Sequence, residues 1–305
     1  MTRPNTAADS DQLTFQNPVT RYSTVEPPIQ HQPEPGLDAE LEPKADHGES
    51  SYRGTGRLNG RKALITGGDS GIGAAVAIAF AREGADVALN YLPDEHADAD
   101  RIREIIEREG RTAVLLPGDL TDKALCASVV SDAVDALGGL DILVNNAGKQ
   151  VVAPSLEELP DEQLTDTYAV NILAMFRITK AALAHLTPGS TIINTTSIEA
   201  YQPAPNLLDY ASAKAAINNF TKGLAQQLAT KGIRVNAVAP GPIWTPLQVS
   251  DGQEKEDLPK FDQVSPMGRA GQPTELAPAY VFFTSSESSY VIGETLHVNG
   301  GMPTP

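Results

Sequence analysis

From Arg57 onward, short runs of apolar residues alternate with longer stretches in which apolar positions recur every three or four residues. Short apolar runs bounded by turn residues are typical of buried strands, and a 3.6-residue period is typical of amphipathic helices. The runs predict strands KALITGG (62–68), DVALNY (86–91), TAVLLPGDL (112–120), LDILVNNAG (140–148), STIINTTS (190–197), IRVNAVAPG (233–241) and TLHVNGG (295–301). The periodic stretches predict helices over 71–85, 96–110, 122–139, 161–186, 208–230 and 274–284.

Strands that alternate with crossover helices favour a parallel sheet with right-handed connections. The pattern therefore predicts an α/β protein in which residues 57–305 form a single doubly wound Rossmann-type domain, with a parallel sheet and helices on both faces. The hydrophobic content of 41% is sufficient for a core of that size.

The first 56 residues lack this periodicity. They carry seven of the 23 prolines and nine acidic against four basic residues. Such a segment buries too little apolar surface to offset its chain entropy, so residues 1–56 are predicted to be an irregular N-terminal extension that is disordered when isolated. An alternative is that the extension lies across a neighbouring subunit, anchored by Phe15, Val19, Tyr22 and Ile29.

Charge and cysteine content exclude several functional classes. The formal net charge of −16 repels nucleic acids and anionic membranes, and no basic patch offsets it. The single Cys126 is predicted to be a small core residue in a reducing compartment, and the scattered histidines indicate no metal site. There is no signal-peptide pattern and no run of about 18 apolar residues, so the protein is predicted to be soluble and cytoplasmic.

The stretch TGGDSGIG (66–73) joins the first predicted strand to the first predicted helix. Glycines at this place let the backbone approach a pyrophosphate, and the free N–H groups at the helix N-terminus favour an anion. The spacing of Gly67, Gly71 and Gly73 differs from the common G-x-G-x-x-G dinucleotide pattern, which leaves a turn that serves only packing as an alternative.

Further motifs follow this turn in order along the chain. They are Asp119 in LPGDLTD, NNAG (145–148), Asn171 in YAVNILAMF, Ser197 after a strand, Tyr210 with Lys214, and PGPIWTP (240–246). Together with T-G-x-x-x-G-x-G, this set resembles the motifs of the short-chain dehydrogenase/reductase family, and the resemblance extends from about Arg57 to the C-terminus. It implies an oxidoreductase that transfers a hydride between a nicotinamide cofactor and a carbonyl or alcohol group.

The resemblance also implies which residues bind the cofactor. Some of them have another interpretation from the residues alone, since Asp119 could cap the next helix and Asn145 could be a strand-end turn residue. The implied residues are Gly67, Asp69, Ser70, Gly71, Ile72 and Gly73 at the pyrophosphate, Asn90 and Tyr91 after the second strand, Asp119 and Leu120 at the adenine, Asn145, Ala147 and Gly148 on the floor, Tyr210, Lys214, Pro240 and Gly241, and Ile243 and Thr245 at the carboxamide.

Tyr210 and Lys214 are four residues apart and therefore lie on one helix face. Reduction of a carbonyl needs a proton at its oxygen, which Tyr210 can donate as general acid and remove in the reverse reaction. Because an ordinary tyrosine has a pKa of about 10, the Lys214 ammonium is expected to lower it. The resemblance implies that Lys214 also holds the nicotinamide ribose, Ser197 binds the substrate oxygen, and Asn171 keeps a water-linked proton path to Lys214. An isolated pair of this kind would more often be a surface helix with a solvated lysine.

The choice between NAD(H) and NADP(H) depends on the end of the second strand. An NAD enzyme usually has an acidic residue there, whereas this sequence has Asn90 and Tyr91, which permit a ribose phosphate. Ser70 stands where many NADP-preferring relatives have a basic residue, and Asp69, Asp94 and Glu95 add negative charge nearby. We therefore expect dual or modest preference, with a lean to NADP(H) by resemblance.

Substrate choice is expected to depend on a loop or short-helix lid over residues 244–268. Within this family, the sequence resembles a subgroup described as aldehyde reductases, general stress proteins and glucose/ribitol dehydrogenase homologues. This resemblance implies that the substrates are small aldehydes or sugar and polyol carbonyls. Candidate contact residues are Gln150, Glu199, Tyr201, Gln202 and Trp244.

Two other functions remain open. A 3-oxoacyl carrier-protein reductase shares the active-site set, but the net charge of −16 disfavours docking of an acidic partner. A non-catalytic cofactor-sensing protein would typically lose the tyrosine or the lysine. The resemblance also implies a homotetramer that pairs the helices near 161–186 and 208–230, although a core-facing stripe explains AMFRITKAALAHL (174–186) equally well.

Overall fold

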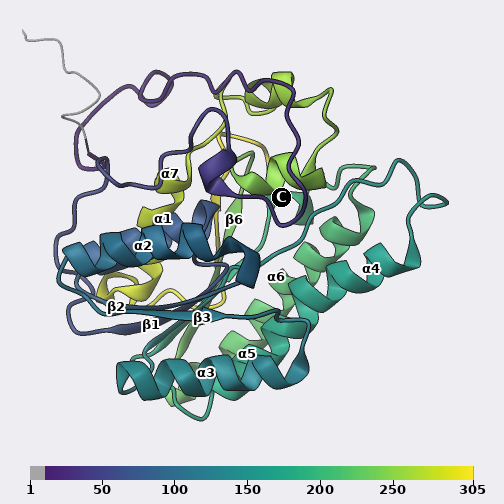
Figure 1. Cartoon of the computed structure of the whole chain (residues 1–305). Coiled ribbons are helices and arrows are strands. Elements are labelled where there is room, and N and C mark those ends of the chain that lie inside the picture. Colours follow the sequence, from purple (N-terminus) through teal and green to yellow (C-terminus); the bar gives the residue numbers. More distant parts are fainter. Residues whose placement is uncertain (1–10, 305) are drawn as a thin grey trace, which may run out of the picture.

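Seven strands form one parallel sheet in the order β3-β2-β1-β4-β5-β6-β7 (Figure 1). The structure is a computed structural model and describes residues 11–304. The strands are β1 (Lys62–Thr66), β2 (Asp86–Tyr91), β3 (Ala113–Pro117), β4 (Ile142–Asn145), β5 (Thr191–Thr195), β6 (Arg234–Pro240) and β7 (Thr295–Val298). The α-helices are α1 (Gly71–Arg82), α2 (His96–Arg108), α3 (Lys123–Leu137), α4 (Asp161–Tyr168), α5 (Met175–Ala182), α6 (Leu208–Leu228) and α7 (Pro273–Thr284).

The strand order reverses direction between β1 and β4, which are neighbours in the sheet. In doubly wound sheets, the crevice at the carboxyl ends of the strands on either side of such a reversal is where ligands bind. The predicted α/β class and parallel Rossmann-type sheet are confirmed, and the topology directs attention to the loops that follow β1, β4 and β5.

Successive strand residues point to opposite faces and so supply two apolar layers. Ile65 packs with Phe80 and Tyr280 on the side covered by α1, α2 and α7. Leu64 packs with Val130 and Val235 on the side covered by α3, α5 and α6. Both layers consist of fully buried side chains, so the sheet is a rigid platform for the loops at its carboxyl edge.

The single helix predicted over 161–186 is wrong in detail. It is divided into α4, a π-helical segment over Ala169–Ala174, and α5. A π-helical turn inserts an extra residue into the α-helical ladder, and such insertions occur frequently at functional sites. The hydrophobic period alone does not reveal it. Asn171 lies inside this segment.

The N-terminal extension is irregular as predicted, apart from a short 3₁₀ turn at Asp38–Glu40, yet its described part packs on its own chain (Figure 1). Val25 and Leu41 are buried in an apolar cluster with Trp244 and Phe261 of the predicted lid. In the single chain, the side chains of Phe15, Val19 and Ile29 are exposed, and Tyr22 packs its ring against the Arg269 guanidinium. That these residues anchor the extension on a neighbouring subunit stays a prediction.

Among the described helices, none is both long and apolar enough to cross a membrane.

Candidate active site

A cavity of about 700 Å³ opens at the carboxyl edge of the sheet. Residues at the ends of six neighbouring strands of the sheet line it, from Gly118 after β3 to Pro240 at the end of β6. Its volume lies in the range typical of ligand sites. Of the residues expected to bind cofactor or substrate, the cavity is lined by Gly67, Asp69, Ser70, Gly71, Ile72, Asn90, Tyr91, Asp119, Leu120, Ala147, Gly148, Ser197, Tyr210, Lys214, Pro240, Gly241, Ile243 and Thr245.

The glycine turn between β1 and α1 forms one wall of the cavity, and its geometry excludes larger residues. Gly67 and Gly71 have φ angles of 59° and 47°, a region that side chains disfavour. A Cβ atom at Gly73 would lie 1.8 Å from the Gly67 carbonyl oxygen. Gly73 does not line the cavity, so its role here is to permit the tight turn that places Ile72 at the wall.

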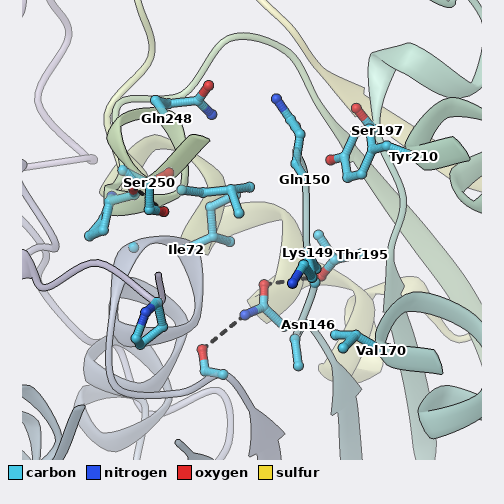
Figure 2. Close-up of a pocket in the computed structure, with 18 of the residues that line it drawn as sticks. Ile72, Asn146, Lys149, Gln150, Val170, Thr195, Ser197, Tyr210, Gln248 and Ser250 are labelled. Atoms are coloured by element: carbon cyan, nitrogen blue, oxygen red, sulfur yellow. Dashed lines mark hydrogen bonds between the residues drawn. The ribbon is translucent and has the colours of Figure 1, made fainter. Parts of the chain in front are cut away.

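The prediction for Asn145 is wrong, because its neighbour Asn146 lines the cavity instead. The Asn145 amide donates to Thr179 Oγ1 at 3.0 Å and to Asn194 Oδ1 at 2.8 Å inside the protein. Asn146 donates to the Gly67 carbonyl at 3.0 Å and so ties the glycine turn to β4 (Figure 2). Adjacent residues of a strand end face opposite sides, and the sequence NNAG does not tell which asparagine faces the site.

Asn90 and Asp69 line the cavity, but their side chains have environments that differ from those of residues that only contact a cofactor. The Asn90 amide donates to the Leu116 and Gly118 carbonyls, at 3.0 and 3.1 Å, so its donors hold β3 in place. Asp69 is fully buried, and burial together with the charge of Glu95 raises the pKa of its carboxyl well above the ordinary value. Asp119 lines the cavity and accepts from the Thr121 N–H at 2.8 Å.

The cap of α3 is Asp122 and not Asp119. The Asp122 side chain accepts from the Ala124 N–H, which removes the helix-cap alternative for Asp119.

Ser197, Tyr210 and Lys214 line the same cavity. Figure 2 shows Ser197 and Tyr210 across the cavity from Ile72, which belongs to the glycine turn. Lys214 Nζ lies 5.4 Å from the centre of the Tyr210 ring and donates to the Thr195 carbonyl at 3.0 Å. The Ser197 hydroxyl lies close enough to the phenol of Tyr210 to lower its pKa. All three side chains are buried, with exposed fractions of 7% or less.

Burial controls the protonation of the Tyr210 and Lys214 side chains. It raises the pKa of Tyr210 above its ordinary value, although the nearby Ser197 hydroxyl acts in the opposite direction. It lowers the pKa of Lys214 to about 8. The expected lowering of the Tyr210 pKa is therefore not met in this structure, because desolvation of the phenolate outweighs the effects that stabilise it. The Tyr210 phenol is protonated at neutral pH.

Asn171 lies next to the cavity and does not line it. Its amide donates to the Lys149 and Thr167 carbonyls, at 2.8 and 2.9 Å, which fixes the side chain within the π-helical segment. Its Oδ1 atom is buried and has no hydrogen-bond partner within residues 11–304. A Cβ atom on Gly148 would lie 3.0 Å from that oxygen and 3.3 Å from Lys214 Nζ, so both atoms approach the same glycine. Buried polar atoms without a protein partner are where ordered water binds.

The family of the chain follows from comparison with known proteins. The protein-family model described as "Enoyl-(Acyl carrier protein) reductase" matches residues 67–303, which include the glycine turn together with Ser197, Tyr210 and Lys214. The chain belongs to the short-chain dehydrogenase/reductase family.

Relatives of the chain within this family cover nearly its whole length. The oxidoreductase YghA of Escherichia coli is 57% identical over 94% of this chain and 98% of its own. The NADPH-dependent aldehyde reductase 1 of Arabidopsis thaliana is 45% identical over 88% and 95%, and the glucose and ribitol dehydrogenase of Daucus carota is 44% identical over 90% and 96%. A short-chain dehydrogenase from Burkholderia cenocepacia, solved in complex with NADP, is 35% identical over 80% of this chain and 98% of its own, with a TM-score of 0.75.

For this member of the short-chain dehydrogenase/reductase family, the structure also decides between the predicted substrate contacts. Gln150 and Glu199 line the cavity, whereas Tyr201, Gln202 and Trp244 do not. Trp244 is fully buried under the extension and donates from Nε1 to the Pro43 carbonyl at 2.7 Å. Tyr201 packs edge-on against His297, with ring centres 4.7 Å apart.

Sequence reasoning missed several residues of the cavity. Glu34 and Pro35 reach it from the extension, and Lys149 pairs with Glu34 at 2.8 Å across its edge. Gln248 and Ser250 reach it from the lid. No sequence signal marks these residues, since they come from irregular segments that only tertiary packing brings to the sheet edge.

Proposed function

We propose that the protein is an NAD(P)-dependent carbonyl reductase and alcohol dehydrogenase that acts on small aldehydes or on sugar and polyol substrates. The observation that carries this proposal is the convergence of Ser197, Tyr210 and Lys214 in one cavity with the glycine turn. The names of the Arabidopsis and carrot relatives support the substrate class. The other two hypotheses have less support, because the net charge disfavours a carrier-protein substrate and a pure sensor does not need this proton-transfer set.

The residues of the cavity fit a nicotinamide dinucleotide. The turn at Gly67 and Gly71 leaves room for a pyrophosphate at the start of α1, where helix N–H groups favour anions. Ile243 and Thr245 also line the cavity, and we propose that the nicotinamide lies against them. When bound, the cofactor supplies or accepts the hydride. We infer NADP(H) or NAD(H), with a lean to NADP(H) because the Arabidopsis relative is named for NADPH and the Burkholderia structure contains NADP.

Each side chain of the site then has its own role in proton transfer to and from the substrate oxygen. Tyr210 donates its phenolic proton to the substrate oxygen during reduction and accepts a proton from the alcohol during oxidation. Ser197, whose hydroxyl lies beside the Tyr210 phenol, orients the same oxygen. Lys214 stabilises the phenolate that forms, since its ammonium lies over the ring. A water on Asn171 Oδ1 is proposed to return the proton through Lys214.

Substitution of Tyr210 tests this assignment. We expect Tyr210→Phe to lower kcat for aldehyde reduction on the order of 10²- to 10⁴-fold, because it removes the general acid alone. Cofactor affinity, measured by fluorescence titration with NADPH and NADH, should stay nearly unchanged. Tyr201→Phe is the matched control, because Tyr201 lies in the same stretch and outside the cavity.

The assay should cross both cofactors with aldehydes, sugars and alcohols. Substantial turnover by Tyr210→Phe would remove Tyr210 from the mechanism. Tight cofactor binding by the wild type without turnover of any substrate would instead favour the sensor hypothesis.

A further inference from the structure

Glu199 holds an unusual place beside the proposed proton donor. Its backbone N–H donates to Ser197 Oγ at 3.1 Å, in the short 3₁₀ turn that follows β5. This bond fixes the backbone of Glu199 beside Ser197, whose hydroxyl is proposed to bind the substrate. Its side chain lines the cavity, and its charge is felt by Tyr210, whose pKa it raises.

The Glu199 carboxylate uses only part of its hydrogen-bonding capacity. Oε2 accepts from the Ala204 N–H at 2.6 Å, which pins the side chain against the loop that returns toward α6. Within residues 11–304, no group donates to Oε1 and no cation pairs with the carboxylate. The side chain is partly buried, and burial raises the pKa of Glu199. A partly desolvated carboxylate oxygen that faces a cavity favours a hydrogen-bond donor from a ligand.

A second acceptor lies on the lid. Gln248 is 8% exposed, lines the cavity, and its Oε1 atom is buried without a partner among the described residues. Figure 2 shows Gln248 and Ser250 on one side of the cavity and Ser197 and Tyr210 on the other. The site therefore offers acceptors on both sides of the place where a small substrate would lie, and hydroxyl groups are the neutral donors that match them.

We propose that Glu199 determines substrate specificity by accepting a hydrogen bond from a hydroxyl group on the carbon next to the reacting carbonyl. The preferred substrates are then hydroxyaldehydes, sugars and the matching polyols, and carbonyl compounds with an adjacent carboxylate are rejected. This inference rests on the proposed function and adds the residue that discriminates between substrates. We infer the position of the substrate hydroxyl from the hydrogen bond between the Glu199 N–H and Ser197 Oγ. This bond holds Glu199 next to Ser197, the residue proposed to bind the carbonyl oxygen.

The chemistry gives selectivity in both directions. A hydrogen bond to a charged acceptor is stronger than one between neutral groups, and a site built for a hydroxyl leaves its acceptor unpaired when an alkyl group replaces that hydroxyl. A substrate carboxylate would meet a like charge in a partly desolvated cavity. Substrates with an alkyl group or a carboxylate beside the carbonyl are both discriminated against, for different reasons.

Three aldehydes that differ only in the group beside the carbonyl test the proposal. Glycolaldehyde carries a hydroxymethyl group, propanal carries an ethyl group, and glyoxylate carries a carboxylate. We expect Glu199→Gln to lower kcat/KM for glycolaldehyde about tenfold, to change it less than about twofold for propanal, and to raise it about tenfold for glyoxylate. The ratio of kcat/KM between variant and wild type for one aldehyde does not depend on what fraction of that aldehyde is hydrated.

Two further variants separate specificity from general damage. Glu199→Asp keeps the charge and should retain the rejection of glyoxylate. Glu107→Gln removes one carboxylate from the exposed face of α2. It should leave the ratio of kcat/KM between variant and wild type near one for all three aldehydes.

A pH profile gives a readout that loss of packing would not move. Removal of the Glu199 charge should shift the acid limb of kcat/KM for 1-propanol oxidation to lower pH, because the phenolate of Tyr210 is no longer repelled.

The outcomes separate this inference from the proposed function. An equal loss on glycolaldehyde and propanal, no loss on glycolaldehyde, or an unmoved pH profile overturns the role of Glu199 while reductase activity stands. If the wild type reduces no aldehyde with either cofactor, the proposed function fails and the inference with it. Should Glu199→Gln not fold, the wild type alone still decides, since it must prefer glycolaldehyde to propanal after correction for the unhydrated fraction.

Discussion

Buried ionisable side chains have environments that their neighbours in sequence do not reveal. The Tyr210 and Lys214 pair is visible in the sequence as two residues one helical turn apart. Their protonation is not, because it depends on how completely the fold removes water from each group. Burial favours the neutral form of both, so the free site holds a protonated phenol and an amine with a pKa of about 8.

His47 of the extension is a second such group. Its Nε2 atom lies 2.9 Å from Asp38 Oδ2 and its Nδ1 atom lies 3.3 Å from Glu49 Oε1, and the ring is almost fully buried. Burial alone would lower the pKa of His47, but the two carboxylates outweigh it and raise the pKa to about 9. His47 is therefore an imidazolium at neutral pH, and its charge ties together two parts of the extension, at Asp38 and at Glu49.

This shift predicts a pH dependence of stability. A group whose pKa is raised on folding stabilises the native state fully below its unfolded value and loses that effect as pH rises through the folded value. The free energy of unfolding of the wild type, relative to His47→Gln, should therefore fall between pH 6.5 and about 9, by roughly 3 kcal/mol. Urea denaturation at a series of pH values measures it. His185→Gln, at an exposed position, is the control, and a difference that does not change with pH contradicts the assignment.

At the scale of elements, the extension completes the start of α1. The first N–H groups of a helix need partners from outside, and the cap residue Ser70 supplies no side-chain bond. Asp38 Oδ2 accepts from the Gly71 N–H at 3.0 Å, while the Asp38 and Ala39 N–H groups donate to Asp98 of α2. A residue 33 positions earlier in the chain thus positions the proposed pyrophosphate turn.

Asp38→Ala should weaken both the fold and the nucleotide site. We expect the free energy of unfolding to fall by about 3 kcal/mol, since the buried His47 loses a partner, and cofactor affinity to fall about fivefold, since the turn loses its cap. Denaturation and fluorescence titration with NADPH measure the two effects. Glu40→Ala removes an exposed acid two residues away and should change neither. If affinity for the cofactor is unchanged in Asp38→Ala, the extension has no part in the nucleotide site.

At the scale of the whole molecule, apolar side chains remain uncovered on the α4–α5 side. Leu173 and Phe176 are 45% and 49% exposed, although Phe176 also packs against Phe220 of α6 at 4.3 Å between ring centres. Met175 and Ile178 face the core instead. The core-facing explanation therefore holds for Met175 and Ile178, whereas subunit pairing through the exposed Leu173 and Phe176 stays a prediction. Exposed apolar faces of this kind often form subunit interfaces.

The homotetramer stays a prediction, and this face provides its test. Light scattering of the wild type should give four times the 32.3 kDa of one chain. The double variant Leu173→Lys with Phe176→Lys should give smaller species, because an unpaired ammonium cannot be buried in an apolar interface without a large cost. Leu156→Lys, in an exposed loop, is the control. A monomeric wild type would refute the tetramer, and an intact tetramer of the double variant would refute this interface.

The sequence by itself determined the class of fold and most of the wall of the site. Strand and helix periods are local, and the carboxyl ends of parallel strands meet at one edge, so Gly67, Ser197, Tyr210 and Lys214 could be placed together from their positions alone. Tertiary structure decided what local pattern does not encode. It chose Asn146 over Asn145 and buried Trp244.

Only the folded chain brought the extension onto the nucleotide turn and left the Glu199 carboxylate with a free oxygen toward the cavity. The physical reason is that side-chain direction at strand ends, helix insertions, burial and partners across irregular segments depend on contacts between residues far apart in sequence. Those contacts also set the charge of Tyr210, Lys214 and His47.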